Sequence, residues 1–361
     1  MKWSIRLGRL FGVDVYVHLT FLLFLAFIGF SHWQQDPRWQ AVALGTGFFV
    51  AVFGCVLLHE FGHALMARRF GVGTQDITLL PIGGIARLDR IPEKPVEELW
   101  VALAGPAVNV VIAGGIFLWL TATSTWVPLS EMSLVGGPLL VRLMMVNVLL
   151  VAFNMLPAFP MDGGRVLRAL LAMRMDYGRA TTLAARIGQG MAVGFAVLGL
   201  YTTPMLFLIA FFVWMGAAGE AGLAQVKSAL RGIPVSRAMM RDFQVLAPSG
   251  PLQGAVDHIL AGSQQDFPVL DKTVLVGLLS RSTIFRVLGE RGAQSPISEA
   301  MQREFAVLDP AMPLEAALAL LNESENRLLP VVEHGVLVGL LTGENLGEFL
   351  LIQAALKHSR V

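Results

Sequence analysis

The sequence predicts a polytopic α-helical membrane protein with six spans, a small β-sheet at the membrane surface and a C-terminal tandem α+β domain. Of its 361 residues, 55% are hydrophobic and only 15% are charged, and the mean hydropathy is +0.64. This composition is too apolar for an ordinary soluble protein. The long apolar runs end near residue 222, and a soluble-like mixture follows from about residue 228. We therefore predict a membrane domain at 1–227 and a second domain at 228–361.

Six apolar runs are each long enough to cross a hydrocarbon core of roughly 30 Å. They cover residues 17–34, 41–66, 98–122, 137–157, 184–201 and 204–222. The fourth run ends at Pro157 and Pro160, which cannot continue a regular helix. Only Thr202 and Thr203 separate the last two runs before Pro204, so this pair is expected to form a tight helical hairpin.

The distribution of basic residues predicts the orientation of these spans. Basic residues gather before the first run and in the segments after the second, fourth and sixth: Lys2, Arg6, Arg9, Arg68, Arg69, Arg87, Arg90, Lys94, Arg165, Arg168, Arg174, Arg179, Arg186, Lys227 and Arg231. The opposite loops hold Arg38 and little else, and residues 123–136 contain no Lys or Arg. We predict an integral, multi-pass protein of a prokaryotic cell membrane with both termini in the cytoplasm. The net charge of +1 favours no nucleic-acid partner, and the lone Cys55 is read as a packing residue.

Three short segments near the predicted cytoplasmic surface alternate like β-strands. They are residues 12–17, 74–81 and 83–88, with a turn at Pro81–Gly84. The sequence therefore predicts a small sheet at this surface. An exposed edge of the sheet could hold an unfolded substrate by strand addition, and a plain surface hairpin fits the same pattern.

A candidate metal site lies near the end of the second apolar run. The segment reads His59-Glu60-Phe61-Gly62-His63, and the run holds no charged residue between Val42 and Glu60. Two histidines four residues apart share one face of a helix and can bind one metal ion. Glu60 lies beside the first histidine, where it can take a proton from a water on the metal. Ionisable groups are costly in a bilayer, so this cluster favours a functional site over a chance pattern.

A third ligand is expected from the end of the fourth run. A catalytic zinc ion usually has three protein ligands and one open position. Asp162 follows the two prolines, and Gly163 and Gly164 permit a tight turn that can bring Asp162 back toward the histidines. The alternative is that Asp162 caps the next helix. Asn154 is a candidate contact to a substrate carbonyl or an oxyanion, with an interhelical hydrogen bond as its alternative.

With these motifs the sequence resembles the site-2 protease family of intramembrane zinc metalloproteases. The resemblance covers roughly residues 1–222. The matching segments are residues 59–63, residues 81–84, Ala104-Gly105-Pro106-Ala107-Val108-Asn109, and the segment with Asn154, Pro157 and Asp162-Gly163. The resemblance implies His59, His63 and Asp162 as ligands of one zinc ion per chain, Glu60 as the catalytic acid/base, and Asn154 as a substrate contact. It also implies regulated cleavage of single-pass membrane proteins, such as an anti-sigma factor or another membrane-tethered regulator, within or beside their spanning helix. Asn109 is expected to bond a neighbouring helix.

The C-terminal domain contains an internal repeat, with copies at about 235–291 and 296–355. Residues 240–248 match 301–310, 267–270 match 329–332, and 275–280 match 337–342. Each copy is expected to fold as strand–helix–strand–strand–helix. This arrangement resembles a tandem pair of cystathionine-β-synthase (CBS) domains, a module that often binds adenine nucleotides.

Nucleotide binding by the repeat is left open by the sequence. The family places an aspartate for ribose three residues after a hydroxyl, but here Thr283 follows Ser280 and Asn345 follows Thr342. A structural pair, or one that forms a homodimer, fits equally well.

The predicted function is an intramembrane zinc endopeptidase modulated by the CBS pair. The alternatives are a CBS-gated transporter or channel that uses the same metal-binding residues, and an inactive membrane chaperone.

Overall fold

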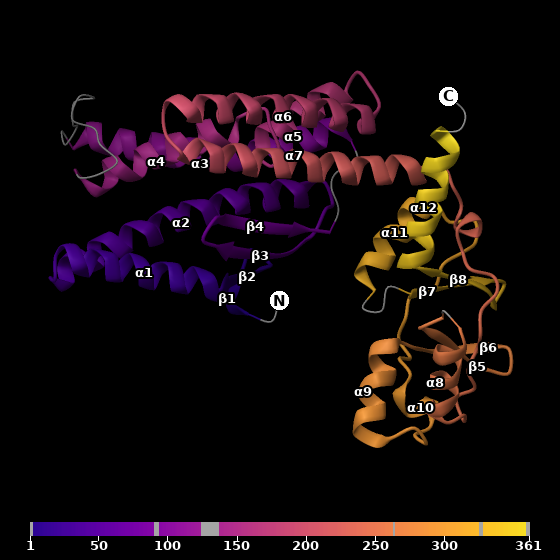
Figure 1. Ribbon diagram of the computed structural model, residues 1–361. Coiled ribbons are helices and arrows are strands. Elements are labelled where there is room, and N and C mark those ends of the chain that lie inside the picture. The colour runs from indigo at the N-terminus through magenta and orange to yellow at the C-terminus, as the bar shows by residue number, and fades with distance from the viewer. Residues whose placement is uncertain (1–2, 90–93, 124–136, 263, 325–327, 359–361) are drawn as a thin grey trace. The chain divides into compact units, whose positions relative to one another are not determined.

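The computed structural model describes residues 3–89, 94–123, 137–262, 264–324 and 328–358. Two compact units make up the chain, Met1–Ala224 and Gln225–Val361. Both units can be followed in Figure 1. Lys2, Arg90 and the loop at 124–136, which enter the predicted orientation, lie outside the described residues.

The first unit is mainly helical. Its helices are α1 (Leu19–Gln35), α2 (Trp39–Arg69), α3 (Pro95–Ala122), α4 (Leu139–Asn154), α5 (Asp162–Ala172), α6 (Tyr177–Tyr201) and α7 (Met205–Leu230). Among the described residues, four helices are long and apolar enough to cross a membrane, namely α2, α3, α6 and α7. The expected hairpin is present, because α6 ends at Tyr201 and α7 begins at Met205.

The first and fourth predicted spans correspond to the two shorter helices α1 and α4. These helices have 17 and 16 residues. At about 1.5 Å per residue they measure about 24–26 Å, less than a hydrocarbon core of about 30 Å. The predicted number of six spans therefore stays a prediction.

A four-stranded sheet lies beside α2. Its strands are β1 (Ser4–Leu10), β2 (Val13–His18), β3 (Thr74–Leu80) and β4 (Gly83–Leu88), in the order β1-β2-β3-β4. β2 and β3 are parallel, and the other two pairs are antiparallel. The three predicted strands are present, and β1 is an addition that the sequence did not suggest. Alternate residues such as Val15 and Ile77 are buried against Phe61 and Ala64 of α2, which anchors the sheet beside the helix that carries the two histidines. Its position at a membrane surface stays a prediction.

The second unit contains two similar halves. The first holds α8 (Leu252–Ala261), β5 (Phe267–Asp271), β6 (Val274–Leu279), α9 (Arg281–Arg291) and α10 (Ile297–Ala300). The second holds α11 (Leu314–Glu323), β7 (Leu328–Glu333), β8 (Val336–Thr342) and α12 (Gly343–His358). Both strand pairs are antiparallel, and Pro268 opposite Leu278 corresponds to Pro330 opposite Leu340. The first strand expected in each copy is reduced to one bridge, from Leu246 in the first half and from Leu308 in the second.

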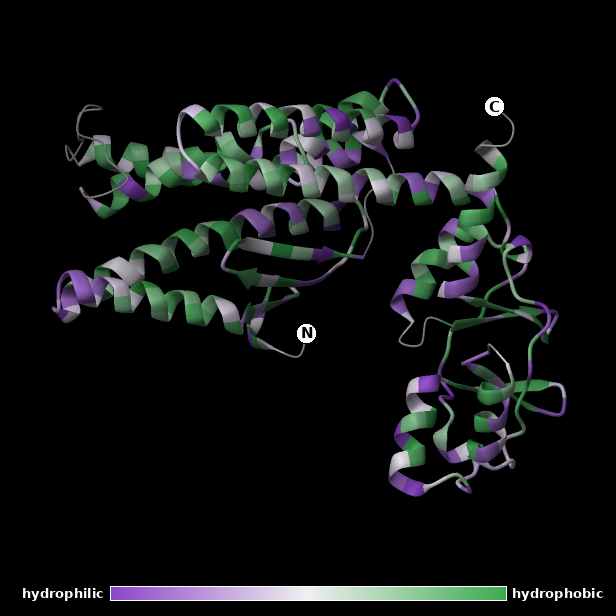
Figure 2. Ribbon diagram, viewed as in Figure 1, coloured by the Kyte–Doolittle hydropathy of each residue, from purple (hydrophilic) through white to green (hydrophobic). Residues whose placement is uncertain are grey.

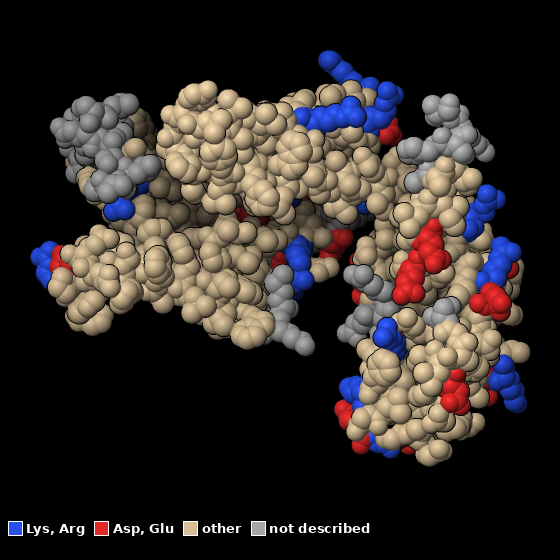
Figure 3. Space-filling view, in the orientation of Figure 1, with Lys and Arg blue, Asp and Glu red and all other residues tan. Residues whose placement is uncertain are grey.

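The two units differ in surface chemistry. Figure 2 shows mostly hydrophobic residues along the helices of the first unit and a mixture of hydrophobic and hydrophilic residues in the second. In Figure 3 much of the visible face of the first unit carries no charge, whereas acidic and basic residues are spread over the second. Many large apolar side chains of the first unit are exposed, including Phe27, Val111, Leu118 and Leu200. Exposed apolar surface of this extent is unusual for a soluble monomer and suits contact with lipid. The predicted boundary at 227 and 228 falls within α7 and stays a prediction.

Candidate metal centre

The structure brings together three of the predicted site residues. His59 and His63 lie one turn apart on α2, Asp162 is the first residue of α5, and all three are buried. Asp162 Oδ2 is 3.1 Å from His59 Nε2 and 3.2 Å from His63 Nε2, and the two Nε2 atoms are 3.1 Å apart. Within the described part of the chain these residues form a group able to hold a metal ion.

Two glycines allow α5 to begin at this place. A Cβ at Gly163 would collide with the carbonyl oxygen of Leu156, and one at Gly164 would lie 2.6 Å from the backbone nitrogen of Phe159. Both glycines therefore let the start of α5 pack directly on the segment that leaves α4. The alternative that Asp162 caps this helix is wrong, because Met161 occupies the N-cap position and makes no side-chain cap.

The Nδ1 atoms of both histidines face oxygen atoms. His63 Nδ1 lies 2.7 Å from the carbonyl oxygen of Val101, and His59 Nδ1 lies 2.6 Å from Oδ1 of Asn109. Both oxygens accept hydrogen bonds, so we assign a proton to each Nδ1. In the neutral rings each Nε2 then directs its lone pair at Asp162 and at the other ring. This is the tautomer that leaves Nε2 able to bind a metal ion.

Asp162 presents one carboxylate oxygen, Oδ2, to both Nε2 atoms. Two imidazole lone pairs and one carboxylate thus meet within hydrogen-bond distance. Such an arrangement is repulsive unless a cation lies between the three atoms.

The spacing of the three atoms suits zinc. Zinc lies about 2.0–2.2 Å from nitrogen and carboxylate ligands in tetrahedral sites, which puts the ligand atoms about 3.3 Å apart. The distances here are 3.1 to 3.2 Å. Gly105 of α3 leaves the space beside them open, because a Cβ there would fall on His63 Nε2 and lie 2.7 Å from His59 Nε2. The donor set and the open space both fit a metal ion.

Glu60 and Asn154 lie on the helices that meet at this cluster. Glu60 is partly buried, and its Cγ lies so close to β4 that a Cβ at Gly84 would be 2.7 Å away. Asn154 is the last residue of α4 and is partly buried. Its amide has no hydrogen-bond partner among the residues that the structure describes. Their catalytic roles stay predictions.

A pair of buried asparagines was not recognised as part of the site from the sequence. The interhelical bond expected for Asn109 is present, since its Nδ2 donates to Oδ1 of Asn147 on α4 at 2.8 Å. The additional contact with His59 was not predicted, and neither was any role for Asn147. The available signal was an uncharged polar residue in the middle of an apolar helix, which usually has a specific partner.

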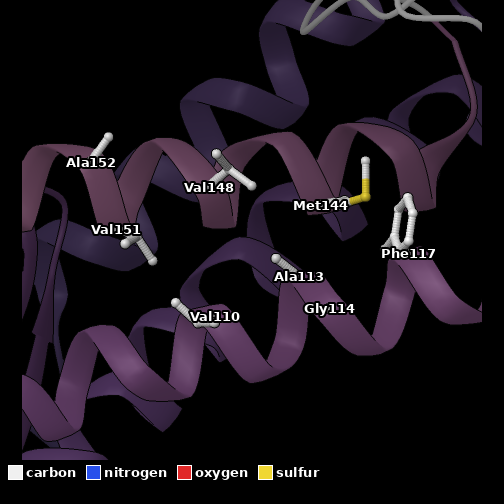
Figure 4. A pocket seen from close by; sticks show the side chains of 8 residues that line it. All are labelled: Val110, Ala113, Gly114, Phe117, Met144, Val148, Val151 and Ala152. Atoms are coloured by element: carbon white, nitrogen blue, oxygen red, sulfur yellow. The ribbon is translucent and has the colours of Figure 1, made fainter.

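An apolar crevice of about 550 Å³ lies elsewhere between α3 and α4 (Figure 4). It is lined by Val110, Ala113, Gly114, Phe117, Met144, Val148, Val151 and Ala152. These side chains offer no polar group for binding or catalysis, in contrast to the cluster around His59.

Two histidines on an apolar helix, a glutamate beside the first and an aspartate from a second helix are the residues that a membrane-embedded metallopeptidase centre would require. The chain belongs to peptidase family M50, whose model matches residues 47–133 and 131–195. It is a zinc metalloprotease and an integral membrane protein of the site-2 protease type, which confirms the predicted resemblance. A CBS-domain model matches residues 297–351, so the family assignment of the C-terminal repeat is confirmed as well.

Relatives named as zinc metalloproteases are similar over most of the chain. Zinc metalloprotease MJ0392 of Methanocaldococcus jannaschii is 34% identical over 80% of this chain and 81% of its own length. A Synechocystis relative that carries the zinc metalloprotease name is 29% identical over 98% of this chain and 97% of its own length. Among solved structures, the site-2 protease from M. jannaschii is 37% identical and covers 61% of this chain and 95% of that one, with a TM-score of 0.44.

The hydroxyls considered for nucleotide binding cap helices in the second unit. Ser280 Oγ accepts a hydrogen bond from the backbone N–H of Thr283 at the start of α9, and Thr342 Oγ1 accepts one from the N–H of Asn345 at the start of α12. Thr342 Oγ1 also donates to Asn345 Oδ1 at 2.6 Å. Thr283 and Asn345, which stand where the family has an aspartate, thus form hydrogen bonds with the neighbouring hydroxyls. Nucleotide binding is not tested by these contacts.

Proposed function

We propose that this protein is an intramembrane zinc endopeptidase that cleaves other membrane proteins within or beside a transmembrane helix. The observation that carries the proposal is the convergence of His59 Nε2, His63 Nε2 and Asp162 Oδ2 in a buried site, one residue from Glu60. A buried carboxylate opposite two imidazole lone pairs suits a metal ion held for chemistry. Membership in a family of zinc metalloproteases supports zinc as that ion.

His59, His63 and Asp162 would hold one zinc ion per chain, leaving a fourth position for water or substrate. When bound, zinc polarises a peptide carbonyl and lowers the pKa of water. The oxygen atoms that contact Nδ1 of each histidine keep both rings oriented. Gly105 keeps the space beside the Nε2 atoms of His59 and His63 open.

Glu60 is the proposed proton carrier. Adjacent residues on a helix point about 100° apart, so Glu60 does not share the direction of His59 and is expected to remain outside the ligand set. Its carboxylate takes a proton from the attacking water and gives it to the leaving nitrogen of the cleaved peptide. Asn154 is the last residue of α4, its amide has no hydrogen-bond partner among the described residues, and it would donate a hydrogen bond to the substrate carbonyl.

The substrate must be extended where it is cut, because helical hydrogen bonds shield the peptide carbonyl. The outer strand β4 passes directly over Glu60 at Gly84. A substrate segment added to this edge as a strand would bring its backbone toward Glu60. Single-pass, membrane-tethered regulators such as anti-sigma factors suit this mode, with cleavage below a cytoplasmic surface that both termini face.

The CBS pair is the proposed regulatory module. α7 begins in the membrane unit, and its last residue, Leu230, is buried in the core of the second unit with Val235 and Leu314. A ligand or a partner can change activity only by its different affinity for two states of the protein. Because Thr283 and Asn345 stand where the family places an aspartate for ribose, we expect ATP and AMP to bind weakly. Control would then come from dimerisation through the pair or from contact with a substrate.

The alternative function is a CBS-gated transporter or channel that uses the same metal-binding residues. Such a protein needs the ligands but has no use for a base beside the first histidine. Retention of Glu60 together with all three ligands also argues against an inactive membrane chaperone.

Substrate trapping tests the proposal. The Glu60→Gln variant, kept in native membranes, should co-purify with intact single-pass proteins that the active chain cleaves. The Asp162→Ala/Glu60→Gln variant controls for proteins that bind without the metal site. A chain that binds zinc, transports an ion and cleaves none of the captured proteins would favour the transporter instead.

A further inference from the structure

Asn147 lies at the far end of a hydrogen-bonded chain that reaches the metal centre. His59 Nδ1 contacts Asn109 Oδ1 at 2.6 Å, and Asn109 Nδ2 donates to Asn147 Oδ1 at 2.8 Å. Asn147 Nδ2 in turn donates to the carbonyl oxygen of Leu143 at 2.8 Å. Both asparagines are fully buried, at 0% exposure.

The backbone carbonyl of Leu143 sets the direction of the whole chain. A carbonyl oxygen can only accept a hydrogen bond, so the NH₂ group of Asn147 must face it. The Asn147 oxygen is then turned toward Asn109, and it can accept only from the NH₂ group of Asn109. Asn109 must therefore present its oxygen to His59, and His59 must donate from Nδ1. The Nε2 lone pair of His59 is left facing the metal position.

We infer that Asn147 is a positioning residue for the zinc site, acting through Asn109 to fix the tautomer and the ring orientation of His59. An amide whose partner is lost can rotate by 180° and exchange its oxygen for its NH₂ group. A rotated Asn109 would offer a donor to Nδ1 and leave the wrong tautomer for metal binding. His63 needs no such chain, because the carbonyl oxygen of Val101 contacts its Nδ1 directly.

The inference rests on the proposed role of His59 as a zinc ligand. The test is the zinc dissociation constant of the purified full-length chain, measured by competition with a chelator. Partners that orient a metal-binding histidine typically change metal affinity 10- to 100-fold. We expect Asn147→Leu to weaken zinc binding by about this factor. Met144→Leu, one turn earlier on α4 and also buried, should leave it unchanged.

A second substitution separates orientation from packing. Both oxygens of a carboxylate accept hydrogen bonds, so Asn109→Asp needs no partner to present an acceptor to His59. In the Asn109→Asp background, Asn147→Leu should no longer weaken zinc binding. An equal loss in both backgrounds would show that Asn147 acts only through packing and would overturn the inference.

Two further measurements keep the test decisive. If Asn147→Leu does not fold, Asn147→Ser replaces it, since a serine hydroxyl can bond the carbonyl four residues earlier but is too short to hold Asn109. The same zinc loss is expected, and unchanged affinity would overturn the inference. Asp162→Ala tests the site itself: undiminished zinc in that variant rejects the proposed ligand set, whatever Asn147 does.

Discussion

Two buried polar clusters of the first unit, one around Asp162 and one around Arg168, are neutralised in different ways. Around Asp162 the carboxylate faces two imidazole nitrogens, and among the described residues no lysine or arginine forms an ion pair with it. Around Arg168 of α5 a guanidinium pairs with Glu98 of α3 at 2.5 Å and with Glu220 of α7 at 2.6 Å. The first cluster has no paired cation among the described residues and is the proposed metal site, whereas the second contains its own cation.

The same short helix carries both clusters. Asp162 begins α5 and Arg168 follows less than two turns later, with 2% exposure. The Arg168 guanidinium also lies 5.0 Å from the ring of Phe159 in the segment that leads into α5. We interpret the second cluster as the structural support of α5 and the first as the site that the support keeps in place. This comparison predicts that variants of the two clusters will fail in different measurements.

Removing the carboxylate from the first cluster should have the largest effect. Asp162→Ala deletes the carboxylate of the candidate ligand group, so bound zinc and peptide cleavage should both be lost. Metal analysis of the purified chain measures the first, and cleavage of a reporter substrate measures the second. Asp36→Ala, which removes a carboxylate that pairs with Arg38 at the surface, is the control. A full zinc complement in Asp162→Ala would remove Asp162 from the ligand set.

Changing the proton carrier should separate chemistry from metal binding. Glu60→Gln keeps size and polarity but cannot accept the proton, so cleavage should fall by about 10²- to 10⁴-fold while zinc content stays at the wild-type level. Glu97→Gln, in a surface pair with the exposed Lys94, should change neither. Substantial residual cleavage by Glu60→Gln would contradict the proposed mechanism.

Filling the space beside the histidines should weaken zinc binding without touching a ligand. A methyl group at Gly105 would overlap His63 Nε2 and crowd His59, so Gly105→Ala should lower zinc affinity by at least about tenfold, the scale on which a displaced ligand shell acts. Gly115→Ala on the same helix meets no atom within 4 Å and is the matched control. Equal zinc affinity in both variants would mean that α3 shifts to accommodate the methyl group.

Substitutions in the cluster around Arg168 should lower the stability of the folded chain. Arg168→Met leaves Glu98 buried without a cation, which typically costs about 3–5 kcal/mol. Thermal unfolding of the purified chain should show a large loss, whereas Arg174→Met at an exposed position should show little. Chains that remain folded should still bind zinc. A loss of zinc affinity with unchanged stability would place Arg168 in the metal site and remove the distinction between the clusters.

The parts of the site that could be predicted are those with local signals. Four-residue spacing places His59 and His63 on one face of any helix, and the prolines and glycines around Asp162 mark a sharp change of direction. Asn147 and Gly105 could not be assigned this way, because their roles depend on which helices pack side by side. That packing brings α3 between α2 and α4, and no pattern within one helix records it.

The fold shows the same division between local and non-local information. The helices and three strands follow hydrophobic patterns, whereas β1 was missed because its basic residues were interpreted only as a flank of the first span. Pairing with β2 supplies the missing information. The repeat in the second unit was visible because its two halves share sequence, but the reduction of each first strand to a single bridge depends on neighbouring strands.

The smallest expected effect concerns the two carboxylates that share Arg168. Glu98 has 3% side-chain exposure and Glu220 has 25%, so water can replace part of the lost interaction only at Glu220. Glu220→Gln should therefore destabilise the chain by about 1 kcal/mol, the range of partly exposed ion pairs. Glu98→Gln should cost about 3 kcal/mol, as for a broken buried pair. Thermal unfolding of both variants measures this difference. Equal losses of stability would mean that burial does not decide how much Glu98 and Glu220 each contribute. Arg168 would then depend on both partners alike, and its ion pairs would hold α7 to α5 as firmly as they hold α3.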